Sequence, residues 1–237
     1  SKPELPENPK CLIGGVFESK IHSHHAKSIG CSDFHDKIKV IGKYKDIPVL
    51  SSLGDTECAI NSIKLLKNEL ILNLGTGSQV VTLSKRYSFI PSGRMFLMFK
   101  SFFESLNKDF FNDLNEITVN EIVDSSLECN LNVFEQSYKF INGGSIQGIL
   151  ETNFNYKNLL ASILKSYINQ YAEYIDLHTP VRVYLIGGIS KKLPIIKNYL
   201  EVLYPNIDFI LNNTPYADTH LGLVNYIKDY EYISNRR

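Results

Sequence analysis

The fold of this chain is decided by two stretches, Ile47-Pro-Val-Leu-Ser-Ser-Leu-Gly-Asp55 and Asn73-Leu-Gly-Thr-Gly-Ser-Gln79. The first is an apolar run that ends in Gly-Asp and then becomes helical. The second follows another apolar run and makes a glycine turn. Backbone N–H groups in such a turn can face phosphate oxygens closely, because glycine has no Cβ. A carboxylate nearby can take a proton from a substrate hydroxyl. Together the stretches favour phosphoryl transfer, although a glycine turn alone also closes ordinary hairpins.

The composition of the 237 residues is that of a globular protein with a sizeable core, because 43% are hydrophobic and 21% charged. This length suits one large domain or two small ones. A net charge of zero argues against a nucleic-acid partner. No apolar run approaches the roughly 18 residues of a membrane span, and no apolar leader is present. Cysteines without C-x-x-C spacing predict reduced thiols in a cytoplasmic protein; they are Cys11, Cys31, Cys58 and Cys129.

The N-terminal region is expected to begin with a linker over residues 1–10, which contain three prolines among polar residues. A short helix is expected over 18–29, with Gly30 as its stop. Three histidines fall inside it, at offsets of two and three residues: His22, His24 and His25. These offsets do not place all three on one helix face, so we expect a solvated surface and no metal site.

The segment from residue 46 to 129 is expected to alternate strands and helices. Apolar patterning predicts strands at 46–53, 69–74, 80–83 and 95–99, and helices at 55–67, 102–111 and 118–129. Residues 69–83 form a hairpin closed by Gly75-Thr-Gly-Ser78. Thr118 and Glu121 make a capping box. Asp55 has two possible roles, an N-cap or a base at the mouth of a cleft, and the sequence leaves both open.

The C-terminal part reads as a crossover unit. Helical spacing predicts a long helix over 156–177, followed by a strand at 181–186, Gly187-Gly188 and a helix from Ser190. Ligands of such units lie beyond the carboxyl end of the strand, where helix N–H groups attract anions. A strand at 207–211 and a helix over 215–230 follow. Gly222 inside the last helix indicates a close approach to another element or a ligand.

In this order the motifs resemble the C-terminal domain of the FGGY family of carbohydrate kinases, within the actin-like ATPase superfamily. Four stretches carry the likeness: Pro48-Val-Leu-Ser-Ser-Leu-Gly-Asp55, Leu72-Asn-Leu-Gly-Thr-Gly-Ser-Gln79, Leu185-Ile-Gly-Gly-Ile-Ser190 and Asp218-Thr-His-Leu-Gly222. The second is most similar to sedoheptulokinase-like sequences. The resemblance implies an α/β fold of the ribonuclease-H-like, actin-like type, a mixed sheet with helices on both faces. It implies one such domain over residues 11–230 and a tail over 231–237.

The resemblance also implies roles for particular residues. The catalytic base falls on Asp55, which would deprotonate a sugar hydroxyl as it attacks the γ-phosphorus of ATP, with Mg²⁺ on the phosphates. The nucleotide-binding positions fall on the second phosphate loop, Gly75, Thr76, Gly77 and Ser78, and on the adenosine pocket, Gly187, Gly188, Ser190 and Lys192. Lys192 departs from the family, in which an Asn or a small residue often meets adenine.

Other departures from the family concern motifs that this sequence lacks. The Asp-x-Gly-Thr pattern of the family's first phosphate loop is absent, so the N-terminal kinase domain is expected to lie outside this chain. Asn142-Gly-Gly-Ser145 stands near the usual Gly-Glu-Arg loop, as a phosphate contact or as a simple turn. The leading hypothesis is the C-terminal lobe of an ATP-dependent kinase for a ketose such as sedoheptulose, partnered by an N-terminal lobe or by itself. The alternatives are an inactive relative that binds nucleotide or a partner protein, and a phosphotransferase whose substrate is not a sugar.

Overall fold

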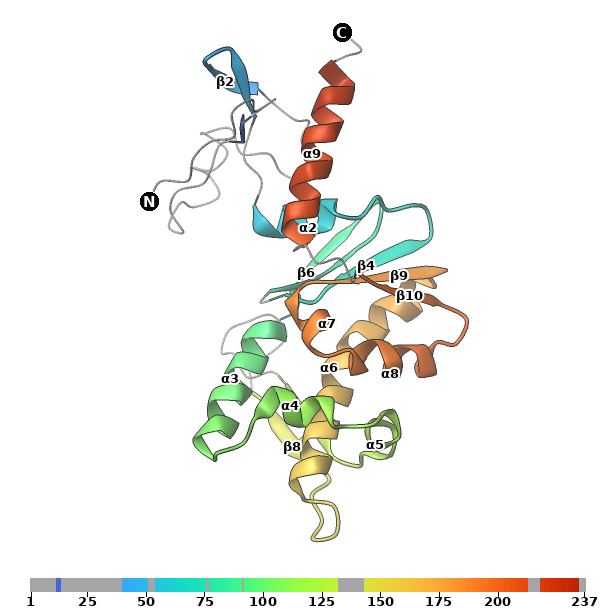
Figure 1. Ribbon diagram of the computed structural model, residues 1–237. Helices are drawn as coiled ribbons and strands as arrows, with labels where there is room; N and C mark the ends of the chain where they lie inside the picture. Colours follow the sequence, from blue (N-terminus) through green and yellow to red (C-terminus); the bar gives the residue numbers. More distant parts are fainter. Residues whose placement is uncertain are drawn as a thin grey trace. The chain divides into compact units, whose positions relative to one another are not determined.

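The computed structural model describes residues 12–13, 40–50, 54–75, 77–90, 92–131, 143–212 and 218–234 (Figure 1). These residues belong to two compact units, which are described separately. The first unit combines Ser1–Lys64 with Pro215–Arg237, and the second is the continuous segment Leu65–Thr214. The single domain expected over 11–230 stays a prediction. The three histidines of the N-terminal region lie outside the described residues.

The first unit contains a small sheet and two helices. The sheet has the order β1-β3-β2, in which β3 pairs parallel with β1 and antiparallel with β2. Its strands are β1 (Leu12–Ile13), β2 (Val40–Tyr44) and β3 (Ile47–Leu50), and its helices are α2 (Asp55–Asn61) and α9 (Asp218–Ser234). Lys45 and Asp46 both have positive φ, as the tight turn between β2 and β3 requires. Helix α9 continues through most of the expected tail.

Helices α2 and α9 pack at very short range, which explains Gly222. A Cβ built on Gly222 would stand 1.6 Å from the backbone oxygen of Cys58 in α2. Asn61 donates to the Gly222 carbonyl at 3.0 Å, and Asn225 donates to the Asn61 carbonyl at 2.9 Å. The close approach expected at Gly222 is therefore confirmed, and its partner is the α2 backbone.

The second unit is built on a five-stranded mixed sheet of order β6-β5-β4-β9-β10. The strands are β4 (Glu69–Asn73), β5 (Ser78–Val81), β6 (Arg86–Ile90), β9 (Arg182–Ile186) and β10 (Asp208–Leu211). The first three form antiparallel pairs, whereas β9 pairs parallel with both β4 and β10. The predicted hairpin and the two C-terminal strands are confirmed, and β4 lies at the centre of the sheet.

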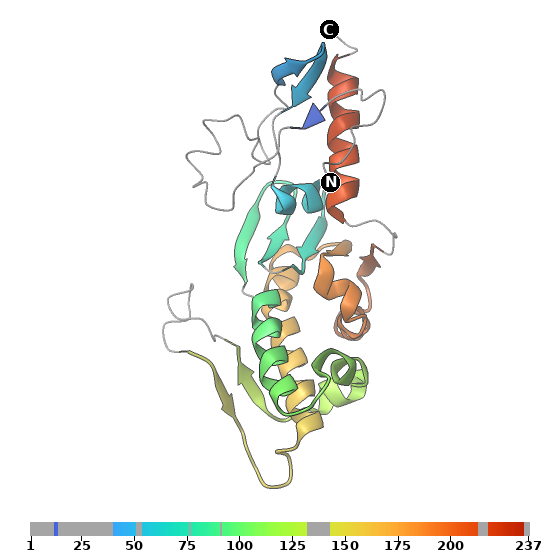
Figure 2. The same cartoon turned by 60° about the vertical axis from the view of Figure 1, so that its left-hand side comes forward.

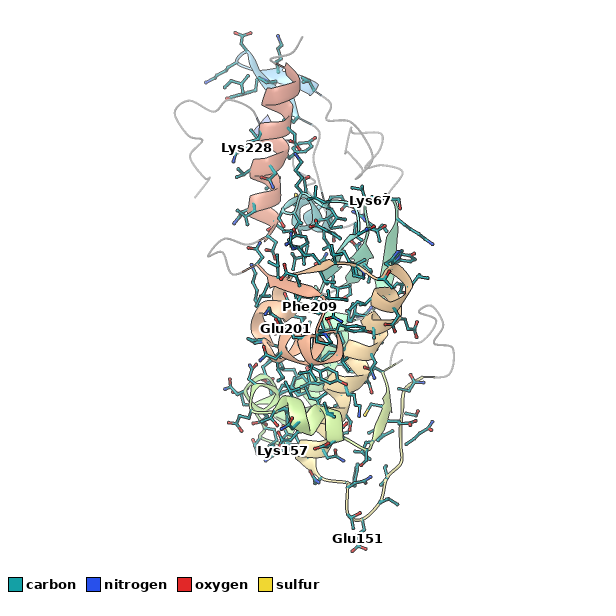
Figure 3. The ribbon with its side chains drawn as sticks, turned by 90° about the vertical axis from the view of Figure 1, so that its right-hand side faces the viewer. Lys67, Glu151, Lys157, Glu201, Phe209 and Lys228 are labelled. Atoms are coloured by element: carbon teal, nitrogen blue, oxygen red, sulfur yellow. The ribbon has the colours of Figure 1, made fainter. Side chains whose placement is uncertain are left out.

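One face of this sheet carries the hydrophobic core of the unit. Leu70, Leu72 and Leu74 point to this face with Val183 and Leu185 of β9. The helices that add side chains to this core are α3 (Ser92–Ser105), α4 (Phe110–Asn115), α5 (Val119–Asp124), α6 (Tyr156–His178), α7 (Gly188–Lys192) and α8 (Ile195–Leu203). Figures 1 and 2 show α6, α7 and α8 on the same side of the strands, and Figure 3 labels Phe209, which β10 adds to this core. Helices on the second face stay a prediction.

Three expectations about local structure are wrong. The third strand of the meander is β6, and Met95–Phe99, expected as a strand, lie in α3. This short apolar run fits either structure, and periodicity alone cannot decide between them. The aromatic helix expected over 102–111 is split into α3 and α4 around Asn107, whose φ is +57°. The helix expected from Ser190 begins at Gly188 and is divided at Pro194, which cannot supply a backbone N–H inside a helix.

The region between α4 and α6 contains less helix than expected. Helix α5 ends at Asp124 instead of Cys129, because residues 128–130 form β7 (Glu128–Asn130), which pairs antiparallel with β8 (Ser145–Gln147). The capping box is confirmed: Thr118 accepts from the Glu121 backbone, and Glu121 accepts from the Thr118 backbone at 2.8 Å.

None of the helices that the structure describes has both the length and the apolar character needed to cross a bilayer.

Candidate functional site

Two glycine turns meet at one edge of the sheet in the second unit. Gly75 follows the end of β4 and Gly187 follows the end of β9, and these strands are parallel neighbours with Asn73 opposite Ile186. Leu74 ties the turns together through its backbone. Its N–H donates to the Ile186 carbonyl at 2.8 Å, and its carbonyl accepts from Ile189 at 3.0 Å. The sheet therefore brings together the two glycine stretches that lie over 100 residues apart in sequence.

The glycines of these turns differ in what surrounds them. Gly187 has a φ of +93°, and a Cβ there would stand 2.7 Å from the Leu74 backbone, so both conformation and space demand glycine. A Cβ on Gly75 would meet Gly77 oxygen at 3.5 Å, an ordinary contact. A Cβ on Gly77 or Gly188 would meet nothing within 4 Å. The place that a Cβ would take is therefore open at these two glycines.

The polar residues predicted to lie beside the turns differ from one another in burial and in their contacts. Ser190 is buried, and its hydroxyl donates to the Gly187 carbonyl at 2.8 Å, so it braces the second turn. Ser78 is buried at the start of β5. Lys192 is exposed at the end of α7, with its ammonium 5.2 Å from the centre of the Phe111 ring. Thr76 lies outside the described residues.

Asp55 belongs to the first unit, where it is the first residue of α2. The N-cap is Gly54, whose carbonyl accepts from the Cys58 N–H at 2.9 Å, so the N-cap role considered for Asp55 is wrong. An acidic residue in the first turn is favoured by the helix dipole. The Asp55 side chain is outside what the structure describes. The structure thus gathers the glycine candidates in one unit, and the role of Asp55 as a base stays a prediction.

Sequence reasoning assigned no role to Asn73 and Gln79, which flank the first turn. They lie opposite each other on β4 and β5, and Asn73 is buried between the two glycine turns. The available signal was a polar residue closing the otherwise apolar run Leu70-Ile-Leu72. A strand end that delivers a buried amide to a glycine turn is a recognisable pattern once the partner strand is known.

The second unit has a cavity whose lining contains no residue of the two glycine turns. A cavity of about 380 Å³ lies between α3, α6 and the β7–β8 ribbon, lined mostly by apolar side chains such as Phe99, Phe102 and Ile163. Burial raises the pKa of the Cys129 thiol in its wall to about 11. Gly144 lines the cavity as well, and the φ of Gly143 is +73°. The turn conformation thus accounts for Gly143, and Asn142 lies outside the described residues.

Metal-binding groups are sparse in the part of the chain that the structure describes. No three His, Cys, Asp or Glu side chains gather there in a way that could hold a metal ion. Glu69 is buried, but its carboxylate pairs with Arg182 at 3.2 Å, and Arg182 also pairs with Asp208 at 2.8 Å. This network joins the amino-terminal ends of β4, β9 and β10, at the opposite end of the strands from the glycine turns.

Comparison with solved structures finds the same fold in carbohydrate kinases. Xylulose kinase from Lactobacillus acidophilus, in a ligand-bound structure, matches with a TM-score of 0.60 and 13% identity over 81% of this chain and 45% of that chain. Xylulose kinase from Bifidobacterium adolescentis matches with a TM-score of 0.56 and 14% identity over 77% of this chain and 42% of that chain. Plasmodium falciparum glycerol kinase with ADP matches with a TM-score of 0.58 and 12% identity over 81% of this chain and 46% of that chain.

These similarities show a shared fold. Because the identities are far below 25%, they show nothing beyond the fold. The chain spans less than half the length of each of these three kinases. No protein-family model matches the sequence, and no curated protein matches it either.

Proposed function

We propose that this chain is one lobe of an ATP-dependent carbohydrate kinase, of the actin-like, ribonuclease-H-like type. The acceptor is a sugar hydroxyl, and we favour a ketose such as sedoheptulose because of the Leu72–Gln79 stretch. The partner is an N-terminal lobe or a second copy of the chain, in the cytoplasm. The alternative is a relative without catalytic activity that binds nucleotide or a partner protein.

One observation carries this proposal: the two glycine turns lie side by side at the carboxyl ends of adjacent parallel strands. Ligands of open α/β sheets bind at this edge. A Cβ on Gly77 or Gly188 would meet nothing within 4 Å, which supports room for a ligand beside these two backbones. Solved kinases with the same fold, one of them with ADP, support the choice of a nucleotide as ligand.

Some residues of this chain would bind the nucleotide, and another would accept the proton. The backbones of Gly75, Gly77, Gly187 and Gly188 would hold the nucleotide, and Ser190 would keep the second turn in shape through its bond to Gly187. Asp55 would accept the proton of the sugar hydroxyl. We expect Mg²⁺ to accompany the nucleotide, where it neutralises charge on the phosphates.

The first experiment measures nucleotide binding and turnover in the complete gene product that contains these residues. Binding of MgATP and MgADP is followed by calorimetry, and ADP release is followed with a panel of ketoses that includes sedoheptulose and xylulose. ADP release with one sugar supports the kinase and names its substrate. Binding without turnover on any sugar favours the inactive relative. Failure to bind either nucleotide contradicts the kinase and leaves only a relative that binds a partner protein.

The Asp55→Asn variant tests the proposed base. Loss of a general base lowers turnover by about 10² to 10⁴-fold, and we expect a kcat reduced in this range with MgATP affinity nearly unchanged. The matched control is Asp229→Asn, an exposed aspartate of α9 in the same unit. Turnover of Asp55→Asn equal to that of the control would exclude Asp55 as the base.

A further inference from the structure

The cavity between α3, α6 and the β7–β8 ribbon takes no part in the proposed function. Its lining includes Phe103, Leu131 and Ile163, which are buried in the hydrophobic core of the second unit. It also includes Phe102 and Ile146, which are 57% and 42% exposed. The cavity therefore reaches from the core to the surface of this unit, and a small molecule could enter it from solvent.

One face of α3 supplies aromatic rings to this cavity. Phe99, Phe102 and Phe103 are three and four residues apart or adjacent, so they lie on one side of the helix. The ring centres of Phe99 and Phe103 are 6.3 Å apart, and those of Phe102 and Phe103 are 5.2 Å apart. Aromatic rings attract a further ring in offset or edge-to-face arrangements. This lining therefore favours an aromatic ligand.

The rest of the cavity wall is neutral. None of the described residues that line it carries a charge, and its polar members are Cys129, Asn130 and Ser145. Burial raises the pKa of the Cys129 thiol to about 11, so this group is uncharged at neutral pH as well. A charged ligand group would lose water here without gaining a partner of opposite charge, which is costly. The wall therefore favours a neutral ligand.

The volume of the cavity sets the size of the ligand. Protein interiors contain few voids larger than a water molecule, because a void deprives its lining of dispersion contacts. An apolar cavity of about 150 Å³ in another protein binds benzene. The cavity of about 380 Å³ in this chain is more than twice as large and lies within the range of about 300–1,000 Å³ that is usual for ligand pockets. In proportion to the benzene cavity it would hold about 10–15 non-hydrogen atoms.

We propose that this cavity is a binding site for a small, neutral aromatic molecule of about the size of two fused rings. The ligand would lie against the aromatic face of α3 and replace the contacts that the empty cavity lacks. This site goes beyond the proposed function, because it shares no residue with the glycine turns or with the proposed base. Success or failure of the tests below therefore leaves the kinase proposal unaffected.

The first test compares two probes that differ in charge. The complete gene product that contains these residues is titrated by calorimetry with 2-naphthol and with 2-naphthoate. We expect one 2-naphthol to bind per chain, and 2-naphthoate to bind at least about 10-fold more weakly because its carboxylate would be buried without a partner. The absence of saturable 2-naphthol binding up to its solubility limit would overturn the proposal, and so would equal affinities for the two probes.

The second test separates the cavity from the apolar surface next to it. Phe102→Ala removes one ring from the lining, so 2-naphthol affinity should fall about 2- to 10-fold. Two controls are exposed apolar residues of the same unit that do not line the cavity: Leu106→Ala, directly after the end of α3, and Phe154→Ala. Both should bind 2-naphthol like the wild type. A loss in Leu106→Ala equal to that in Phe102→Ala would place the probe on the surface and contradict the proposal.

The third test uses the Cys129 thiol in the cavity wall and needs no variant. Alkylation by N-ethylmaleimide is followed at each cysteine by peptide mass spectrometry, with and without 2-naphthol. At ten times the dissociation constant of 2-naphthol, the rate at Cys129 should fall about 10-fold, because the bound fraction is protected. Cys58 of the first unit is the control, and its rate should not change. An unchanged rate at Cys129 while 2-naphthol is bound would overturn the proposal.

Discussion

At the scale of single residues, the glycines of the two turns have different physical reasons to be glycine. Gly187 is required by the protein itself, through its positive φ and the Leu74 backbone 2.7 Å from any Cβ. Gly188 has a helical backbone as the first residue of α7 and open space where a Cβ would stand. The first glycine therefore serves the fold, and the second can be reserved for a ligand.

This difference predicts opposite effects for two alanine substitutions. Gly187→Ala forces a side chain into a left-handed conformation and against backbone atoms, so we expect a loss of about 2–4 kcal/mol in the free energy of unfolding. Gly188→Ala should leave stability unchanged or raise it by up to about 1 kcal/mol, because alanine favours a helix, yet it should weaken MgADP binding. Urea unfolding and calorimetry measure the two quantities. Equal stability losses in both variants would contradict this assignment.

At the scale of elements, helix α5 shows how a local sequence signal becomes a contact between helices. Glu121 closes the capping box with Thr118, and its carboxylate also pairs with Lys157 in the first turn of α6 at 2.5 Å. The hydrogen bond from Lys157, followed by that from the Thr118 backbone, lowers the pKa of Glu121 to about 2. One carboxylate thus caps α5 and connects it to α6.

The lowered pKa of Glu121 predicts an acid-dependent contribution to stability. A carboxylate whose folded pKa is below its ordinary value of 4.5 stabilises the fold above pH 4.5, and this contribution is lost as the pH falls toward 2. Glu121→Gln should therefore lower the melting temperature at pH 6 and approach the wild type near pH 2.5. The control is Glu151→Gln, at the exposed loop tip labelled in Figure 3. A constant difference between Glu121→Gln and wild type across this range would refute the linkage.

Elements with strong local signals could be predicted from sequence, and the others could not. The hairpin of β4 and β5, strand β9, helix α6 and the Thr118 cap all follow from periodicity or capping residues close in sequence. The strand expected over Met95–Phe99 is part of helix α3, and strand β6 was not expected, because a short apolar run fits either structure. The same holds for the site: the glycine turns have a motif, whereas the burial of Asn73 between the two turns depends on where β9 places Gly187.

At the scale of the whole molecule, the two units are built from the chain in different ways. The second unit is one continuous segment, and the large hydrophobic cluster falls entirely within it. The first unit joins the two ends of the chain, with Asp55 in one part and Gly222 in the other. The motifs of the proposed nucleotide site and of the proposed base therefore lie in different units.

The surface of the second unit carries exposed apolar side chains that form a stripe along α3 and the residue after its end. Met98, Phe102 and Leu106 follow one another at intervals of four residues, and Phe102 and Leu106 are each more than half exposed. Side chains four residues apart are neighbours on a helix. A row of this kind suits a contact surface better than single exposed residues do, because contiguous apolar area is uncommon on monomeric proteins.

We therefore predict that the 237-residue chain, studied alone, self-associates with increasing concentration and binds a dye that reports apolar surface. Sedimentation velocity across a hundred-fold concentration range measures the first property, and fluorescence of the bound dye measures the second. The double variant Phe102→Ser and Leu106→Ser should reduce both, because it interrupts the stripe at its most exposed positions. Leu177→Ser, at a single exposed leucine near the end of α6, should change neither. A chain that stays monomeric throughout and binds no dye would show that α3 is not a contact surface.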